Sequence, residues 1–207
     1  MRVPLLAALS LLIPLTAPAQ TKLLSPSLDN WEKVGDGLWS MMRDGTLVGQ
    51  RDLKVAVHQA WLYSKKEYGE FDLHVEWWTR WGGNSGVSLR DTSRGKWSGK
   101  DHDPVRTPSH IGYEIQISNG YDDKYPTGSV YLFDKAKTGF QILNDWNTFD
   151  IESRNEGMKV KLNGHLVSEY AGEPGRPKKG PIGLQLHDST TVVMFRNITI
   201  REVGNPR

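Results

Sequence analysis

The chain has 207 residues, a formal net charge of +2 and no cysteine. Without cysteine there is no disulfide, no thiolate nucleophile and no thiolate metal site, so stability must come from a packed core. Lysines and arginines are scattered except for a short cluster within residues 176–179, and this charge distribution predicts binding to neither nucleic acid nor membranes.

Residues 1–19 have the parts of a secretory signal peptide. A charged start precedes an apolar stretch over residues 3–15, and mostly small residues lead up to Ala19. The apolar stretch is shorter than the ~20 residues that span a bilayer, which disfavours the alternative of a membrane anchor. We therefore predict cleavage after Ala19 and a single exported domain over residues 20–207, periplasmic or secreted.

Short runs that alternate apolar and polar residues recur from about residue 39 to residue 203, separated by Gly, Asn, Asp and Pro. This pattern predicts an antiparallel β-sandwich or barrel. Residues 71–78 alternate most clearly, and a last strand is expected over 193–203. Asp44-Gly45 and Asn163-Gly164 have the composition of tight hairpin turns.

Two irregular segments, residues 91–109 and 119–127, flank the strand predicted around Glu114. Loops of this size are often functional, because a rigid sheet can present them over a site. The glycines of residues 82–86 lack the following helix and Lys-Ser/Thr pair of a phosphate loop, so they are expected to allow a bulge or a close ligand approach.

Three segments carry the pattern of a sugar site: residues 86–90 (GVSLR), 112–117 (GYEIQI) and 182–187 (IGLQLH). Since strand side chains alternate faces, one phase is apolar and is expected in the core: Val87, Leu89, Tyr113, Ile115, Ile117, Ile182, Leu184 and Leu186. The opposite phase carries Arg90, Glu114, Gln116, Gln185 and His187. If the strands share one sheet, these five side chains converge on a surface suited to a polyhydroxylated ligand.

Glu114 is the first candidate for acid–base chemistry, against the alternative of a solvated sheet face. Conventional glycosidases need two carboxylates, but the residue two positions after Glu114 is the amide Gln116. Asp72 and Glu76 form another acidic set, on a strand with the character of a solvated face. A conventional retaining mechanism is therefore disfavoured.

Other side chains have a functional and a simpler interpretation. His187 suits proton transfer or metal ligation, or is a hydrogen-bonded surface histidine, and Arg90 can bind vicinal hydroxyls or a carbonyl, or form a surface ion pair. Polar groups of the long loop can ligate a metal or be solvated: Asp101, His102, Asp103 and His110. Three tryptophans can stack on sugar rings or fill a core: Trp78, Trp81 and Trp97.

Taken in order, the motifs resemble the 3-keto-disaccharide hydrolase domain family over nearly all of the chain after residue 19. The matching motifs are WLY at 61–63, YGEFDLHVE at 68–76, GNSGVSLR at 83–90, GYEIQI at 112–117, GSVY at 128–131, DWN at 145–147, LNG at 162–164, GPIGLQLH at 180–187 and FRNI at 195–198. The resemblance implies an all-β, concanavalin A-like jelly roll of two antiparallel sheets.

The resemblance also implies action on glycosides already oxidised at the C3 hydroxyl. A C3 ketone acidifies the C2 hydrogen, so that a base can remove it and the C1 substituent can leave by β-elimination, with or without later addition of water. Glu114 and His187 are then the base and acid in an order the sequence leaves open, and the predicted substrate-binding residues are Arg90, Gln116, Gln185, Asn84, Tyr131 and Trp97.

No cofactor is required by this chemistry, although a divalent metal ion can assist the enolate. The expected partners are an oxidised (3-keto) sugar and, functionally, a sugar 3-dehydrogenase. A non-catalytic, lectin-like carbohydrate-binding module and a conventional glucanase are the competing interpretations, because one fold can host all three functions.

Overall fold

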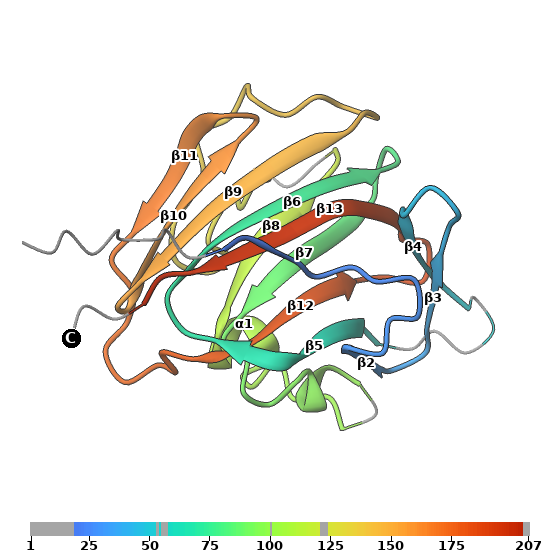
Figure 1. The fold of residues 1–207 in the computed structure, drawn as a ribbon, viewed down its shortest axis with the longest axis horizontal. Coiled ribbons are helices and arrows are strands. Elements are labelled where there is room, and N and C mark those ends of the chain that lie inside the picture. The colour runs from blue at the N-terminus through green and yellow to red at the C-terminus, as the bar shows by residue number, and fades with distance from the viewer. Residues whose placement is uncertain (1–18, 53, 55–57, 100, 121–123, 205–207) are drawn as a thin grey trace, which may run out of the picture.

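The strands form two antiparallel sheets, which pack face to face and bury their apolar sides against each other (Figure 1). The chain is described here by a computed structural model, which covers residues 19–52, 54, 58–99, 101–120 and 124–204. The predicted signal peptide lies almost wholly outside the described residues. The fold confirms the prediction of an all-β sandwich of two antiparallel sheets.

The larger sheet consists of β1 (Thr21–Lys22), β3 (Gly37–Met41), β4 (Leu47–Arg51), β6 (Phe71–Thr79), β9 (Asn147–Arg154), β10 (Gly157–Leu162), β11 (His165–Tyr170) and β13 (Val192–Glu202). Its strand order is β11-β10-β9-β6-β13-β4-β3, with β1 paired to β13 beside this path. The smaller sheet consists of β2 (Trp31–Val34), β5 (Ala60–Tyr68), β7 (Asn84–Leu89), β8 (Tyr113–Ser118) and β12 (Gly180–Leu186). Its order is β2-β5-β12-β7-β8.

The turn chemistry read from the sequence explains the hairpins. Asn163 and Gly164 have φ values of 51° and 82° between β10 and β11, the left-handed region that a two-residue hairpin turn requires. Asp44-Gly45 joins β3 to β4, where the Thr46 amide donates to Asp44 Oδ1 at 2.9 Å. β6 alternates buried and half-buried residues along its whole length, as predicted.

The three segments that suggested a sugar site lie side by side. β7 lies between β12 and β8 in the smaller sheet, and the eight apolar side chains predicted for their core face are all buried. The polar side chains on the opposite face of these three strands therefore lie together on the outer face of the smaller sheet.

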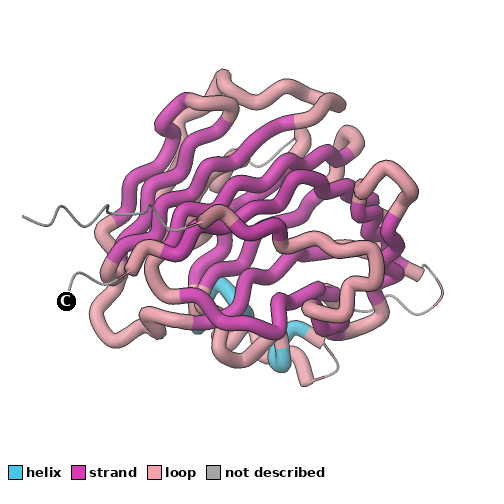
Figure 2. The backbone as a smooth tube through the Cα atoms, viewed as in Figure 1, coloured by secondary structure: helices cyan, strands magenta, loops and turns pink. Residues whose placement is uncertain are grey.

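Two short helices interrupt the segment predicted as one long loop. They are the 3₁₀ helix η1 (Lys96–Ser98) and α1 (Pro108–Ile111), the cyan segments near the lower edge of Figure 2. α1 has proline at its first position, where the fixed φ and the missing N–H are tolerated. Neither helix, nor any other in the described part of the chain, is long and apolar enough to cross a membrane.

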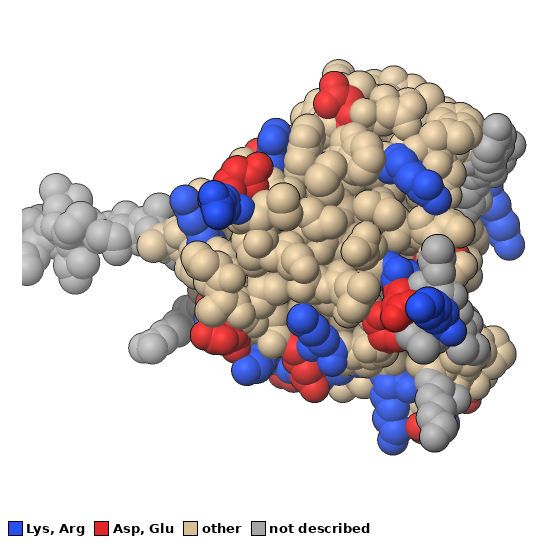
Figure 3. Space-filling model, turned by 90° about the vertical axis from the view of Figure 1, so that its right-hand side faces the viewer, with Lys and Arg blue, Asp and Glu red and all other residues tan. Residues whose placement is uncertain are grey.

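The surface shown in Figure 3 is mostly uncharged, with lysine and arginine interspersed with aspartate and glutamate rather than gathered by sign. On the outer face of the larger sheet charges are paired: Lys159 Nζ lies 2.8 Å from Glu169 Oε1, and Arg196 Nε lies 2.6 Å from Glu76 Oε2.

Candidate active site

Strand register brings polar side chains together on the outer face of the smaller sheet. Ser88 of β7 pairs with Glu114 of β8, and Gly86 pairs with Gln116. On the other side of β7, Gly183 of β12 pairs with Ser88. These paired positions form rows across the three strands. The side chains on either side of them along each strand lie in the core, and because strand side chains alternate faces, those in the rows point to the outer face of the sheet.

Two glycines make room for side chains of this face. A Cβ added to Gly86 would lie 2.5 Å from Glu114 Oε1, so the carboxyl group lies across position 86. A Cβ on Gly183 would lie 2.5 Å from the ring of Tyr63. Gly86 therefore accommodates the protein's own carboxylate, rather than the bulge or ligand approach expected from the sequence.

A cavity of about 200 Å³ opens over these rows. It is lined by Gln59, Asn84, His102, Pro104, Thr107, Ser109, His110, Glu114, Gln116, Tyr131, Leu132, Gln185 and His187. The structure thus brings together six of the eight side chains predicted for the site: Asn84, Glu114, Gln116, Tyr131, Gln185 and His187.

The Glu114 carboxyl is the chemical centre of the cavity. Only 4% of the residue is exposed, and burial raises its pKa from 4.5 to about 8, with a further contribution from the negative charge of Asp91. The nearby polar side chains of Gln185 and Ser109 act in the opposite direction and lower the pKa. A carboxyl group with this pKa is mostly protonated at neutral pH and can donate or, once ionised, accept a proton near physiological pH.

The amide of Gln185 is buried without a hydrogen bond of normal geometry to any described residue. The residue is 1% exposed, and among the described residues neither its Oε1 nor its Nε2 forms a hydrogen bond of normal distance and angle, although the Glu114 carboxyl lies nearby. Gln116 Nε2, in contrast, donates a long bond of 3.4 Å to Asn84 Oδ1. Buried amides are normally paired, so an unpaired one at the floor of a cavity is suited to a ligand's carbonyl or hydroxyl.

Two imidazoles complete the titratable set. Burial and the nearby Arg176 cation lower the pKa of His110, whose Nδ1 lies 2.7 Å from Thr107 Oγ1. Partial burial also lowers the pKa of His187, against the charge of Asp188. Because 43% of the His187 side chain is exposed, solvent moderates that shift. Both rings are neutral near pH 7 and can accept a proton.

A second buried carboxylate, Asp91, lies close to this face but serves to anchor a loop. Its Oδ2 accepts the Tyr63 hydroxyl at 2.7 Å and the Gly95 amide at 2.8 Å, while Oδ1 accepts both the amide and the hydroxyl of Ser93. With both oxygens occupied, Asp91 holds the segment that follows β7. Glu114 is therefore the only carboxylate lining the cavity among the described residues.

The prediction that Arg90 faces the sugar surface is wrong. β7 ends at Leu89, and Arg90 has a φ of 60°, so the alternation of faces is broken there. Its guanidinium donates to Asn155 O and Ser153 Oγ, both at 2.7 Å, and to Gly69 O at 3.3 Å. Arg90 is thus a buried connection to the other sheet.

Trp97 does not line the cavity either. The guanidinium of Arg106 lies 3.7 Å and the ammonium of Lys96 4.5 Å from its ring centre, so cations already lie against the aromatic surface expected to stack on sugar. The metal-ligand hypothesis for the long loop also lacks a geometric basis: among the described residues, no three His, Cys, Asp or Glu side chains are grouped to hold a metal ion.

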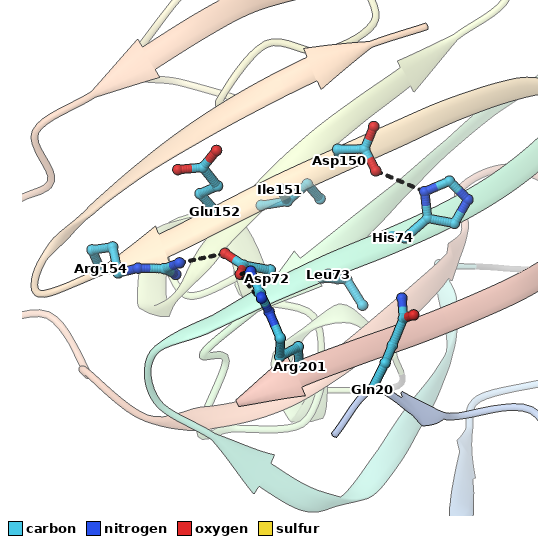
Figure 4. Close-up of a pocket in the computed structure, with 9 residues that line it drawn as sticks. All are labelled: Gln20, Asp72, Leu73, His74, Asp150, Ile151, Glu152, Arg154 and Arg201. Carbon is cyan, nitrogen blue, oxygen red and sulfur yellow. Dashed lines mark hydrogen bonds and ion pairs between the residues drawn. The ribbon is translucent and has the colours of Figure 1, made fainter. Parts of the chain in front are cut away.

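The other acidic set, Asp72 and Glu76, lies on the outer face of the larger sheet. Figure 4 shows Asp72 between Arg154 and Arg201, which both donate to it, in a hollow of about 550 Å³. Partial burial acts to raise the pKa of Asp72, but the hydrogen bonds from the two arginines outweigh it and lower the pKa. The paired carboxylates of this face are separated from Glu114 by the sandwich core and provide no second carboxylate for its cavity.

The cavity walls come from residues that strand alternation could not assign. Ser109 and His110 are brought in by α1, and His102 and Pro104 by the irregular segment before it. The only signal in the sequence was the polar, histidine-containing composition of this segment. Leu132 belongs to a tight turn after Val130 and gave no signal at all.

The two packed antiparallel sheets, with a polar cavity on the outer face of the smaller one, define a β-sandwich with the concanavalin A-like fold. Within this class, the chain belongs to the family of 3-keto-alpha-glucoside-1,2-lyase-like domains, whose model matches residues 21–201. The resemblance drawn from the sequence motifs is confirmed.

Solved structures agree with this assignment. A protein from Parabacteroides distasonis, provisionally described as a glycosyl hydrolase, is 25% identical with a TM-score of 0.70, over 89% of this chain and 100% of that one. The carbohydrate-binding module CBM66 from Bacillus subtilis (17%, 0.57, over 84% and 96%) and a Bacillus licheniformis beta-glucanase (13%, 0.53, over 92% and 100%) share the fold. Comparison with curated proteins gave no match.

Proposed function

We propose that this protein cleaves glycosides whose sugar already carries a ketone at C3. The C2–H bond breaks, the electron pair forms an enolate with the C3 oxygen, and the enolate then expels the C1 substituent to leave a C1–C2 double bond. Water can add to this product afterwards. The observation that carries the proposal is the presence of one buried carboxyl group, Glu114, where a conventional glycosidase needs two.

The elimination needs one base, one proton donor and a group that stabilises the enolate. Glu114 is protonated near neutral pH and is assigned as the donor to the departing oxygen. The neutral imidazole of His187 is assigned as the base for the C2 proton. The amide of Gln185, which forms no hydrogen bond of normal geometry with the described residues, supplies an N–H to the C3 oxygen, and Gln116 binds a hydroxyl.

The assignment of acid and base is tested by the pH dependence of kcat/KM. With Glu114 as donor, kcat/KM falls as the pH rises through about 8, because the carboxyl loses the proton it must give. A kcat/KM that instead rises through the same range would reverse the roles of the two residues while leaving the elimination in place.

The proposal includes export and a preceding oxidation step. The apolar stretch before Gln20 supports release into the periplasm or medium, which N-terminal sequencing of the mature protein tests. A C3 ketone must come from oxidation of a sugar hydroxyl, so the substrate is supplied by a sugar 3-dehydrogenase.

The decisive experiment is a mass-spectrometric product assay on the mature protein and its Glu114→Gln variant. A disaccharide and its 3-keto derivative are offered in parallel, with and without chelator. Cleavage of the keto form alone, lost in the variant, is the expected result. Cleavage of the unoxidised sugar would indicate a conventional glucanase, and binding without cleavage of either would indicate a non-catalytic binding module.

A further inference from the structure

The cavity over Glu114 changes in polarity from floor to rim. Its buried floor is wholly polar and consists of Glu114, Gln116, Gln185 and Ser109. The exposed and half-buried rim contains the only two apolar residues in the described lining, Pro104 and Leu132. The other rim residues are polar, so among the described lining residues Pro104 and Leu132 alone offer apolar side chains to the part of a ligand that lies at the rim.

The rim around Pro104 carries further apolar and aromatic surface. Val105, the next residue along the chain, is 71% exposed. His102 lines the cavity and stacks on His58, with ring centres 5.2 Å apart and planes 9° from parallel. The faces of these stacked rings, beside a proline and a valine, offer a surface for apolar contact.

Leu132 has a backbone conformation that disfavours leucine. Its φ is 76°, in the left-handed region that glycine adopts readily and bulky side chains rarely adopt. The turn is fixed from both sides: the Tyr131 amide donates to Glu114 O at 2.9 Å, and the Phe133 amide donates to Val130 O at 2.9 Å. A leucine kept in a strained turn that is bonded directly to the strand of Glu114 points to a function for its side chain.

The size of the cavity separates the two parts of a glycoside. At about 200 Å³ it is smaller than the ~300–1,000 Å³ of sites that enclose drug-sized ligands, so one sugar ring occupies the polar floor. The C1 substituent then lies at the rim. The turn at Leu132 is hydrogen-bonded to the backbone carbonyl of Glu114, and both residues line the cavity, so a leaving group whose oxygen lies at the Glu114 carboxyl can reach this leucine at the rim.

We propose that Leu132 and Pro104 bind an apolar leaving group, so that the preferred substrates are 3-keto-glycosides of alkyl or aryl alcohols rather than of a second sugar. This inference rests on the proposed function and specifies its substrate class. It assigns Leu132 as a specificity-determining residue that contacts the leaving group, with the polar floor binding the sugar.

The test compares two substrates that differ only in the polarity of the leaving group. They are the 3-keto-glucosides of hexanol and of 1,5-pentanediol, which have the same length and nearly the same leaving-group basicity. We expect kcat/KM to be about 5- to 10-fold higher for the hexyl substrate, the effect of a partly enclosed apolar contact. A ratio of one or less in the wild-type protein would overturn the inference.

Variants at Leu132 separate its side chain from its backbone. Leu132→Gly relieves the positive φ and removes the side chain, and Leu132→Asn tolerates this conformation but is polar. In either folded variant the substrate ratio is expected to fall to about one. Leu28→Gly is the matched control, because Leu28 also has a positive φ (53°) but does not line the cavity.

The outcomes separate this inference from the proposed function. An unchanged ratio in both Leu132 variants would show that another surface selects the leaving group and would overturn the inference alone. Equal cleavage of both substrates by the wild-type protein would do the same and leave the elimination intact. Failure to cleave either keto-glycoside would overturn the proposed function itself.

Discussion

A single proton on Glu114 links the chemistry of the site to the stability of the fold. The carboxyl pKa is about 8 in the folded protein, compared with 4.5 for the free group, because the neutral form is favoured by burial. The folded state therefore keeps a proton that the unfolded state releases. The resulting stabilisation is complete below about pH 4.5 and is lost as the pH rises through about 8.

Replacing Glu114 with glutamine should remove this pH dependence. We expect Glu114→Gln to match the wild-type protein in free energy of unfolding near pH 4 and to exceed it near pH 9, by up to roughly 5 kcal/mol at ~1.4 kcal/mol per pKa unit. Urea unfolding at both pH values measures the difference, with the more exposed Glu67→Gln as the control. Equal stability of variant and wild type at both pH values would contradict the raised pKa.

β7 contributes to the site through Gly86, whose lack of a side chain leaves room for the Glu114 carboxyl. A methyl group at position 86 would lie 2.5 Å from Glu114 Oε1 and 2.9 Å from its Cγ. Since a flexible side chain can move aside, Gly86→Ala is expected to displace the carboxyl and lower kcat by ~100-fold, with less than about 1.5 kcal/mol of lost stability. Gly69→Ala is the control, because its added methyl group meets no atom closer than 3.7 Å.

The helix α1 depends on an arginine from the connection before β12. Arg176 donates to Ser109 O at 3.0 Å and to Gly112 O, and its guanidinium lies 4.5 Å from the Phe133 ring centre. Arg176 is thus a positioning residue for the helix that carries Ser109 and His110. Burial and this cation together lower the pKa of His110, while Asp103 opposes the change.

We expect Arg176→Gln to lower kcat/KM by about tenfold and to raise the pKa of His110 toward its usual value of 6.5. NMR titration of the imidazole measures the pKa separately from catalysis. Lys179→Gln removes the same charge from the same connection without these contacts and should change neither quantity. A loss of activity with an unmoved His110 pKa would show that the arginine acts on the fold alone.

The alternation of apolar and polar residues predicted the strands of the site better than the short helix and the turn that line its cavity. The period of two placed Glu114, Gln116 and Gln185 on one face because their strands run straight through the sheet. It failed at Arg90, where the strand has ended and a positive φ turns the chain. Four-residue helices and tight turns have too few residues for a detectable period, so α1 and the turn at Leu132 emerge only from tertiary contacts.

At the scale of the whole molecule, Arg90 joins the two layers. It follows a strand of the smaller sheet and donates to Ser153 Oγ of β9. It also donates to the carbonyl of Gly69, in the turn before β6, and to that of Asn155, in the turn after β9. The first residue of β12 also packs closely here, since a Cβ on Gly180 would lie 2.6 Å from the Arg90 Cα. The residue predicted to bind sugar therefore stabilises the sandwich that carries the candidate site.

Arg90→Met should lower the free energy of unfolding by about 2–4 kcal/mol, because three buried acceptors lose a charged donor. Arg90→Lys, which keeps the charge but not the planar fork, should lie between the two proteins. Activity per folded molecule should stay within about twofold of wild type, since Arg90 does not line the cavity. Urea unfolding combined with kcat/KM at a temperature where all three proteins are folded separates the two effects. A large loss of kcat/KM in folded Arg90→Met would return this arginine to the site and require the loop after β7 to change position when substrate binds.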